Sequence, residues 1–273
     1  MTSSGSLFLG IVQGVTEFLP VSSSAHLVLA QHFLGVREHA LLLDVMLHVG
    51  TLLATVWYFR ADILLIAARF FGKTAGTDAD WLASPAEARK YVLFIILATI
   101  PAAAVGVTLK DFIETLFTSP AAAGCNLFIT GVLLLATLLA RRDGKQTALL
   151  PVWAIFAVGI AQAAAIAPGI SRSGATISAA LLVGARRDDA ARFSFLLSIP
   201  AILGAAALQT GDLRSSDLAP HLASIAAGTA AAFLSGLVAL HVVFTAVRRS
   251  TLAVFTPYCW AVAAAALIAL RFK

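Results

Sequence analysis

Six apolar segments, each about as long as a membrane-spanning helix, constrain the fold of this chain more than any other feature. They cover residues 40–59, 91–109, 121–140, 193–209, 221–246 and 252–270. A helix needs about 20 apolar residues to cross a bilayer. Only 12% of the residues are charged, whereas about 25% are charged in an ordinary soluble domain. This excludes a water-soluble enzyme and a nucleic-acid-binding module. We expect an all-α polytopic membrane protein in which residues 1–273 form a single integral membrane domain.

Two further apolar segments are interrupted in the middle. Residues 6–34 are broken by Pro20–Ser24, and residues 152–184 are broken by Pro168–Gly174. Proline lacks a backbone donor and disfavours helix in the preceding residue, so each break is expected to be a loop between two half-length helices. Loop backbone at membrane depth must be buried in protein or line a wet cavity. We therefore predict six transmembrane helices plus two re-entrant helix–loop–helix hairpins.

The distribution of Lys and Arg agrees with this interpretation. If neither broken segment crosses the membrane, 13 of the 19 Lys and Arg residues lie on one side and five on the other, with Arg172 left inside. The positive-inside rule places the more basic side in the cytoplasm. This assignment requires six spans with both termini outside. The cytoplasmic connections are then 60–90, 141–150, 185–192 and 247–251.

The two broken segments also resemble each other. Residues 10–13 (GIVQ) are similar to residues 159–162 (GIAQ), about 149 positions later, and a proline and a serine-rich loop follow each. The halves, about 1–142 and 150–273, then supply three spans each and have opposite orientations. In inverted repeats with broken helices the ligand site lies near the bilayer midplane, where the broken segments meet. We expect this architecture here.

Arg172 lies in the second loop, inside a predicted membrane segment. A guanidinium at this depth costs about 2.5–3.5 kcal/mol on insertion scales, so it needs a polar partner. Arg172 could simply hold the loop together by binding carbonyl groups. We favour an anion site, because Ser171, Ser173 and Gly174 adjoin Arg172 just before a helix predicted over 175–184. Free N–H groups and the dipole at a helix start favour phosphate, and the guanidinium fork matches phosphate oxygens.

Glu17 is the acidic counterpart in the first broken segment. Gln13 and Glu17 are four residues apart and share one helix face. Their oxygens suit a hard divalent cation, Mg²⁺ or Ca²⁺, which also bridges phosphates. Both are therefore candidate metal ligands. Glu17 could also pair with Arg172, and one role does not exclude the other, while for Gln13 alone an interhelical hydrogen bond is favoured. A second pair four residues apart, Asp44 and His48, is more typical of capping and interhelical bonding than of metal ligation.

His26 follows the serine cluster of the first loop, Ser22-Ser23-Ser24. Serine is a poor nucleophile unless a base takes its proton, and His26 is a suitable base nearby. Ser23 is three residues from His26, which places both side chains on one face of a helix. Either Ser23 attacks with His26 as its base, or His26 attacks phosphorus itself. The residues alone leave both mechanisms open.

These motifs resemble the two signatures of the bacterial undecaprenyl-diphosphate phosphatases, the bacitracin-resistance family. Residues 13–26 (QGVTEFLPVSSSAH) resemble the first signature, and residues 168–176 (PGISRSGAT) resemble the second. The length, the number of spans and residues 193–200 (FSFLLSIP) are also similar, so the resemblance covers nearly the whole chain. The first family motif is Glu or Gln followed four residues later by Glu, and this chain has the Gln variant. Ala25 stands where the family commonly has Gly.

The resemblance implies hydrolysis of undecaprenyl diphosphate to undecaprenyl phosphate and inorganic phosphate, which recycles the lipid carrier of cell-wall synthesis. It implies that Arg172 clamps the diphosphate, that Glu17 assists metal and diphosphate binding, and that Ser23 or His26 is the nucleophile or its base. It also implies a multi-pass protein of the bacterial plasma (inner) membrane with its site facing the extracytoplasmic side. The expected substrate contacts are Gln13, Ser22, Ser171, Arg172, Ser173, Gly174 and Thr176.

A transporter or flippase of a polyprenyl phosphate lipid is the competing hypothesis, because inverted repeats of broken helices are typical of transporters. Transport of an anion does not require a Ser/His pair beside an arginine loop, so we favour the hydrolase. The expected partners are a polyprenyl diphosphate and membrane lipids, with no nucleic acid. A homodimer is kept as a candidate assembly.

Overall fold

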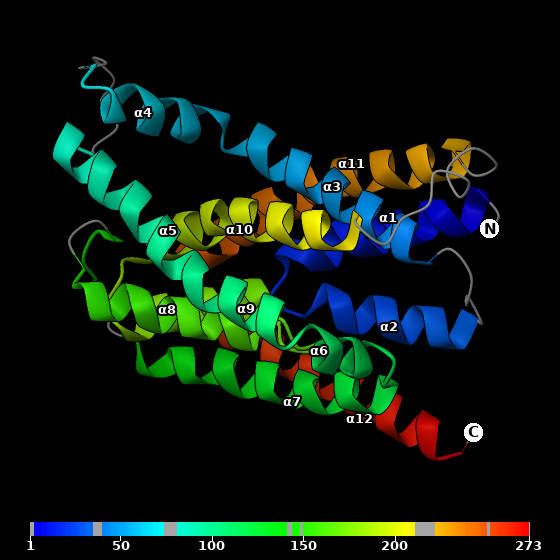
Figure 1. Cartoon of the computed structure of the whole chain (residues 1–273). Coiled ribbons are helices and arrows are strands. Elements are labelled where there is room, and N and C mark those ends of the chain that lie inside the picture. The colour runs from blue at the N-terminus through cyan, green and yellow to red at the C-terminus, as the bar shows by residue number, and fades with distance from the viewer. Residues whose placement is uncertain are drawn as a thin grey trace.

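The computed structural model describes residues 3–34, 40–73, 81–140, 144–147, 150–210, 222–249 and 252–272. These residues form twelve α-helices and two short 3-10 helices (Figure 1). The elements are α1 (Ser3–Phe18), α2 (Ser23–Leu34), α3 (Ala40–Tyr58), α4 (Arg60–Phe70), α5 (Pro85–Thr108), α6 (Lys110–Phe117), α7 (Pro120–Ala136), η1 (Thr137–Leu139), α8 (Val152–Ala164), α9 (Arg172–Leu182), α10 (Arg187–Thr210), α11 (Leu222–Arg249), η5 (Leu252–Phe255) and α12 (Thr256–Arg271). The described part of the chain contains no β-sheet.

Five segments are long and apolar enough to cross a membrane: α5, α7 with η1, α10, α11, and α12 with η5. They correspond to the last five predicted segments. The first predicted segment, 40–59, corresponds to α3, which meets α4 at an angle of 65° and forms a sixth span only if the bent pair counts as one. The protein is therefore an all-helical, multi-pass membrane protein.

Helices α4 and α6 occupy regions where the sequence predicted connections. Both continue a longer apolar helix after a break, α4 after α3 and α6 after α5. In α6 no residue is buried, and Phe112 is 58% exposed. A short helix with separate polar and apolar faces satisfies its own backbone groups while lying at a surface. The helix predicted over 175–184 also begins earlier, at Arg172, with Ser171 as its N-cap.

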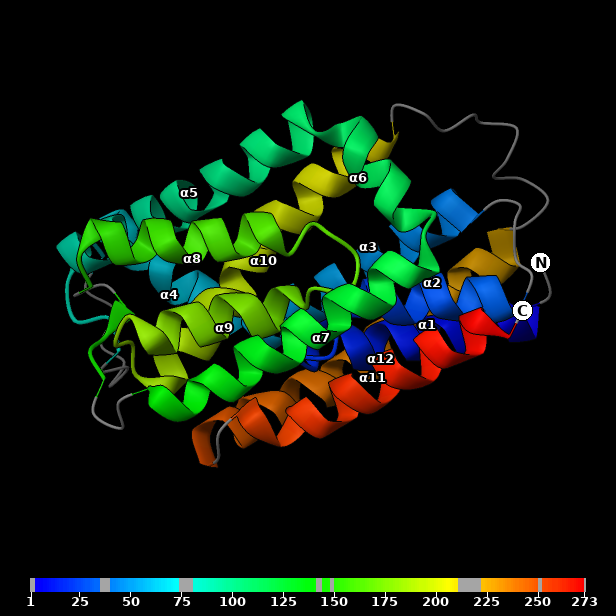
Figure 2. The ribbon, with the colours of Figure 1, turned by 90° about the horizontal axis from the view of Figure 1, so that it is seen from below.

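The two broken segments form helix–loop–helix hairpins, α1–α2 and α8–α9, with breaks at the predicted residues. The hairpins enter the helical bundle from opposite ends, and their loops meet about halfway along it (Figures 1 and 2). The loops are directly linked: Gly169 N donates to Ser24 Oγ at 3.4 Å, and Ser173 Oγ donates to the carbonyl of Leu19 at 3.4 Å. The fold therefore brings both serine-rich loops to one place.

Glycines on α1 allow the first hairpin to pack closely against α11. A Cβ on Gly14 would lie 2.0 Å from Ser235 Oγ and 2.5 Å from the carbonyl oxygen of Ala232, and a Cβ on Gly10 would lie 2.2 Å from the carbonyl oxygen of Gly228. Helices in membranes associate through such small residues because lipid provides no hydrophobic driving force. This contact anchors the helix that carries Glu17.

The variant Gly14→Ala is expected to destabilise the protein by about 1–3 kcal/mol, because the added methyl group overlaps backbone that cannot move away. The matched control is Gly204→Ala on α10, where a Cβ would meet nothing within 4 Å and where alanine favours the helix by about 0.5–1 kcal/mol. Thermal unfolding in detergent, followed by circular dichroism, measures both effects. Equal midpoints for the two variants would contradict the packing argument.

Charged residues tie α4 to α10 at the end where the α8–α9 hairpin enters (Figure 1). Arg192 Nε lies 3.1 Å from Asp62 Oδ1, and its guanidinium lies 4.4 Å from the Trp81 ring centroid. The Arg192 side chain is only 12% exposed. Arg192, one of the charges in the predicted cytoplasmic connections, therefore also fastens α4 in place. Five of the 19 Lys and Arg residues lie outside the described residues: Arg141 and Arg142 from the predicted cytoplasmic connections, and Arg37, Arg214 and Lys273 from the opposite side.

Candidate active site

Glu17 is the residue at which the two hairpins meet. Its Oε1 accepts a hydrogen bond from Arg172 Nη2. Its Oε2 accepts from Ser23 Oγ at 2.6 Å and from Gln13 Nε2 at 3.1 Å, and His48 Nε2 lies 3.9 Å away. The Glu17 side chain is 6% exposed, and a buried carboxylate is tolerated only when it is paired and hydrogen-bonded. Here one charge partner and two neutral donors surround it.

The first loop aims Ser23 at this carboxylate. Ser22, just before α2, has a φ of 65°, a left-handed conformation that is uncommon for residues other than glycine and that concentrates at functional sites. Its Oγ accepts from the backbone N–H of Ala25 at 3.4 Å, so Ser22 caps α2. Ser23 is consequently the first residue of α2, and its hydroxyl faces Glu17 near the end of α1.

The second loop is held by its own cap and by α7. Ser171 Oγ accepts from the backbone N–H of the third residue of α9 at 3.1 Å. Thr130 Oγ1 donates to the carbonyl of Gly169 at 2.7 Å and accepts from Ser171 N at 2.9 Å. Gly169 has a φ of +100°, and a Cβ there would lie 2.3 Å from the carbonyl oxygen of Ala123. Only glycine fits this position, so α7 fixes the path of the loop.

Arg172 is the first residue of α9 and points across to α1. One amino group, Nη2, binds Glu17, and the other, Nη1, is buried without a hydrogen-bond partner among the described residues. A buried donor on a cation is costly to leave unpaired. Arg172 Nη1 can therefore donate a hydrogen bond to an anionic oxygen. Beside it lies Ser23, whose hydroxyl is already hydrogen-bonded to the Glu17 carboxylate.

Residues 6–265 match the model of the family described as bacitracin resistance protein BacA. The chain belongs to the BacA family. Several proteins that match this chain along nearly their full length carry the name undecaprenyl-diphosphatase. That of Desulfatibacillum aliphaticivorans is 46% identical over 96% of this chain and 97% of its own length. That of Rubrobacter xylanophilus is 42% identical over 94% of each chain, and that of Methanobrevibacter smithii is 40% identical over 94% of this chain and 93% of its own.

The BacA-family hairpins bring most of the predicted site residues together. Glu17 directly contacts Gln13, Ser23 and Arg172. Ser171 and Ser173 adjoin Arg172, with their hydroxyl oxygens 3.2 Å apart, and Gly174 binds the Ser171 cap. Thr176 is placed differently. Its buried hydroxyl donates to the carbonyl of Arg172 at 2.7 Å and lies 2.6 Å from Ser194 Oγ. The Thr176 hydroxyl, which was expected in the phosphate pocket, therefore contacts α10.

Ser23 and His26, which the sequence places on one helix face, are not hydrogen-bonded to each other in the structure. Ser23 donates to Glu17, and both ring nitrogens of His26 have other partners. Nδ1 lies 2.8 Å from the carbonyl oxygen of Ser22, and Nε2 lies 2.8 Å from the hydroxyl of Tyr258. The physical reason is that the turn at Ser22 directs its carbonyl at the imidazole, while α12 supplies a hydroxyl on the opposite side.

Sequence reasoning missed several residues that hold the site. Asn126 Nδ2 donates to the carbonyl of Pro168 at 2.8 Å, and Thr130 binds the same loop. Both are polar residues in an apolar span, which was the available signal, because such groups need partners in a membrane. The interhelical role expected of Asp44 is confirmed, since both of its oxygens accept from Gln31 of α2 at 2.8 and 3.1 Å.

A divalent cation would find few protein ligands here. Among the described residues no group of three or more His, Cys, Asp or Glu side chains could hold a metal. Gln13 Oε1 is buried without a hydrogen-bond partner in this part of the chain, and Gln13 binds the Glu17 carboxylate. Mg²⁺ commonly uses one or two carboxylates together with substrate phosphates. The donor set therefore fits a cation shared with a diphosphate and does not fit a cage built by the protein alone.

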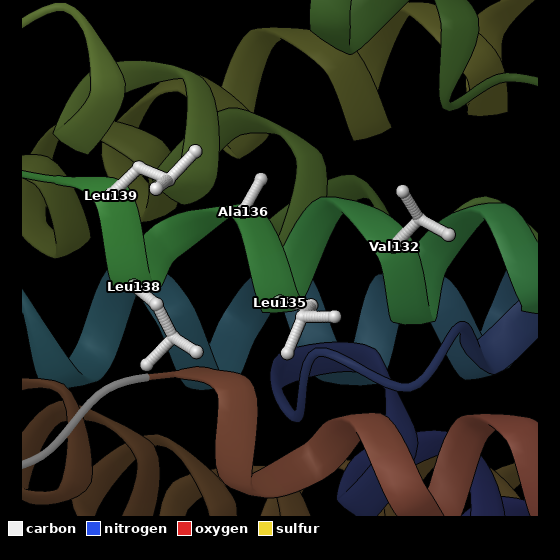
Figure 3. A pocket seen from close by; sticks show the side chains of 5 residues that line it. All are labelled: Val132, Leu135, Ala136, Leu138 and Leu139. Carbon is white, nitrogen blue, oxygen red and sulfur yellow. The ribbon is translucent and has the colours of Figure 1, made fainter.

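An apolar groove lies along α7 and η1, away from these polar residues. Its lining consists of Val132, Leu135, Ala136, Leu138 and Leu139, and Figure 3 shows that all five side chains come from this one stretch. Leu139 is 82% exposed. None of the predicted site residues lines the groove, so it forms part of the apolar surface expected of a membrane protein.

Proposed function

We propose that this chain hydrolyses undecaprenyl diphosphate to undecaprenyl phosphate and inorganic phosphate, and so returns the lipid carrier to cell-wall synthesis. The observation that carries the proposal is the buried cluster in which Arg172 and the Ser23 hydroxyl bind the two oxygens of Glu17. An unpaired guanidinium nitrogen for phosphate and a serine bound to a proton acceptor are the groups that this reaction needs. The name shared by the relatives supports the same substrate.

The proposal includes a membrane arrangement. The bundle has six spans, and the hairpins α1–α2 and α8–α9 are re-entrant, as parts of an inverted repeat with halves of about 1–142 and 150–273. The opposite directions of the hairpins support this arrangement (Figures 1 and 2). The protein lies in the plasma (inner) membrane of a bacterium, with the site open to the extracytoplasmic side. The excess of Lys and Arg in the predicted cytoplasmic connections supports the orientation of the chain across that membrane.

In the proposed reaction Arg172 binds the diphosphate through Nη1 and neutralises the charge that develops on its oxygens. Ser23 Oγ attacks the terminal phosphorus, its proton passes to Glu17 Oε2, and the bond from phosphorus to the bridging oxygen breaks. Undecaprenyl phosphate leaves, and the phosphoryl group stays on Ser23. Water then attacks this phosphoserine, inorganic phosphate is released, and Ser23 recovers its proton. The short hydrogen bond from Ser23 to Glu17 favours Ser23 over His26 as the nucleophile.

A divalent cation, Mg²⁺ or Ca²⁺, belongs to the proposal. Glu17 and Gln13 Oε1 would hold it, and when bound it would neutralise phosphate charge. Chelation is expected to lower phosphate release by at least about tenfold, because charge neutralisation carries much of phosphoryl-transfer catalysis. Adding back Mg²⁺ or Ca²⁺ restores the rate. Full activity in excess chelator would contradict the cation requirement and leave the hydrolase itself intact.

Phosphate release from undecaprenyl diphosphate by purified protein in detergent tests the function directly. Release by the wild type, with a soluble phosphate ester turned over poorly, is the expected result. The opposed hairpins also favour a transporter or flippase. No phosphate release, together with translocation of a polyprenyl phosphate in liposomes, would replace the hydrolase by that second candidate.

A further inference from the structure

The surroundings of His26 determine which of its ring nitrogens is basic. Nδ1 lies 2.8 Å from the backbone carbonyl oxygen of Ser22. A carbonyl oxygen can only accept, so Nδ1 carries the proton. In the neutral ring Nε2 is then an acceptor, and the hydroxyl of Tyr258, 2.8 Å away, is its donor. The two rings lie nearly parallel, 5° apart, with centroids separated by 5.8 Å. In its neutral form His26 is therefore a base whose Nε2 lone pair accepts a hydrogen bond from the tyrosine O–H.

Tyr258 is held on a well-anchored element. The next residue on α12, Cys259, is buried, and its Sγ donates to the carbonyl of Pro20 in the first loop at 3.6 Å. Trp260 Nε1 donates to the carbonyl of Phe128 on α7 at 3.2 Å, and a Cβ on Gly131 would lie 2.2 Å from that indole nitrogen. Two consecutive residues of α12 thus fasten it to the first loop and to α7, the helix that also holds the second loop.

The cluster around Glu17 provides no acceptor for one of the protons that move in the reaction. Ser23 gives its proton to Glu17 when it attacks, and Glu17 returns that proton when Ser23 leaves phosphorus. The water that attacks the phosphoserine must lose a proton to something else. His26 is on the same helix as Ser23, three residues away, and is not engaged with Ser23 or Glu17 through either ring nitrogen.

We propose that Tyr258 is a further catalytic residue, which relays the proton of the attacking water to His26. Because the Tyr258 O–H donates to the lone pair of His26 Nε2, a proton that reaches this nitrogen is transferred through that hydrogen bond. The water oxygen bonds to phosphorus, the water proton moves to the tyrosine oxygen, and the tyrosine proton moves to Nε2. The bond from Ser23 Oγ to phosphorus breaks, and Ser23 takes back its proton from Glu17. The proton on Nε2 is then released to solvent, which returns His26 to its neutral form. Tyr258 is 46% exposed, so its ring is not sealed in the core. This inference rests on the proposed hydrolase function.

The variant Tyr258→Phe removes the hydroxyl and keeps the ring. We expect kcat for phosphate release to fall about 10²-fold, the lower end of general acid–base effects. KM should change by less than about twofold, because the interaction lost is made in the transition state. The matched control is Tyr58→Phe on α3, where the ring packs against Phe59 and Phe244 and where we expect kcat within about twofold of the wild type.

Two further readouts separate a relay from a structural role. With substrate labelled by ³²P in the terminal phosphate, acid-quenched Tyr258→Phe should carry label on Ser23 during turnover, because only the second step is slowed. In ¹⁵N-histidine-labelled protein at a pH at which the ring is neutral, His26 should show a protonated Nδ1, and Tyr258→Phe should shift its Nε2 resonance. His26→Gln identifies the resonance by its loss.

Each result decides one point. If the wild type releases no phosphate, the proposed function fails before the relay is tested. If the wild type is active and Tyr258→Phe keeps its kcat, the relay is refuted. A fall in kcat without labelled Ser23, or a His26 ring with its proton on Nε2, also overturns it. Labelled Ser23 in Tyr258→Phe but not in Tyr58→Phe, together with the shifted Nε2 resonance, supports the relay.

Discussion

Arg172→Ala is expected to lower kcat for phosphate release by at least about 10³-fold, since removal of a single preorganised donor to a developing anion costs about 10²–10³-fold and here the charge is lost as well. The variant also leaves Glu17 buried without its charge partner, which costs about 3–5 kcal/mol of stability. Phosphate release from undecaprenyl diphosphate should therefore be measured on protein whose fold is verified by size-exclusion chromatography and circular dichroism.

Two controls separate the loss of the clamp from a loss of the fold. Arg172→Lys keeps a cation opposite Glu17 but loses the guanidinium fork, so it should fold as the wild type does and remain strongly impaired. Lys73→Ala removes an exposed charge just after α4 and should leave activity within about twofold of the wild type. Wild-type activity in folded Arg172→Ala would refute the assignment of Arg172 as the diphosphate clamp.

Ser23→Ala is expected to be the most severe single change, with a loss of at least about 10⁴-fold in kcat, because removal of a nucleophile abolishes the covalent route. The variant should fold normally, since Glu17 retains Arg172 and Gln13 as partners. Label from the terminal phosphate should not be found on the protein. Phosphate release and acid-quenched labelling measure both effects.

Ser24→Ala is the neighbouring comparison. Ser24 Oγ lies 3.1 Å from Ser22 Oγ and accepts from Gly169 N at 3.4 Å, so it links the loops without touching Glu17. We expect a loss of less than about tenfold, the cost of one long hydrogen bond. If Ser23→Ala retains activity and label appears on His26, then His26 is the nucleophile and the role proposed for Ser23 is wrong.

Much of the helix arrangement was predictable because it depends on short stretches of chain. Apolar length predicts a spanning helix, and the helices α5, α7, α10, α11 and α12 follow the predicted segments. Proline removes a backbone donor and can break a helix, and the breaks near Pro20 and Pro168 are present. Pro101 and Pro200, by contrast, lie inside α5 and α10, as proline in a membrane helix can when neighbouring groups satisfy the freed backbone. The bend between α3 and α4 and the helix α6 were not predicted, because the charged residues that begin at Arg60 and Lys110 mark the end of an apolar span but do not show that a further helix follows.

The candidate site was predictable as a set of residues and less so as a set of contacts. Glu17 and Arg172 are charges in apolar segments, so each needed a partner, and they pair with each other. The direction of His26 was not predictable, because helical spacing places it on the same face as Ser23 but does not say which group from another helix comes closer. That group is Tyr258.

The sequence by itself determined the apolar segments, their two breaks, the signatures of the BacA family and the residue types of the site, because these depend on composition and on spacing within a few turns of chain. Only the tertiary structure decided that Ser23 donates to Glu17, that Tyr258 binds His26, and that Thr130 of α7 holds the second loop. The latter two contacts join residues far apart in the chain, and the first depends on how the loop at Ser22 turns. Such contacts are set by how closely α1, α7, α11 and α12 approach one another, and no local pattern in the sequence encodes those distances.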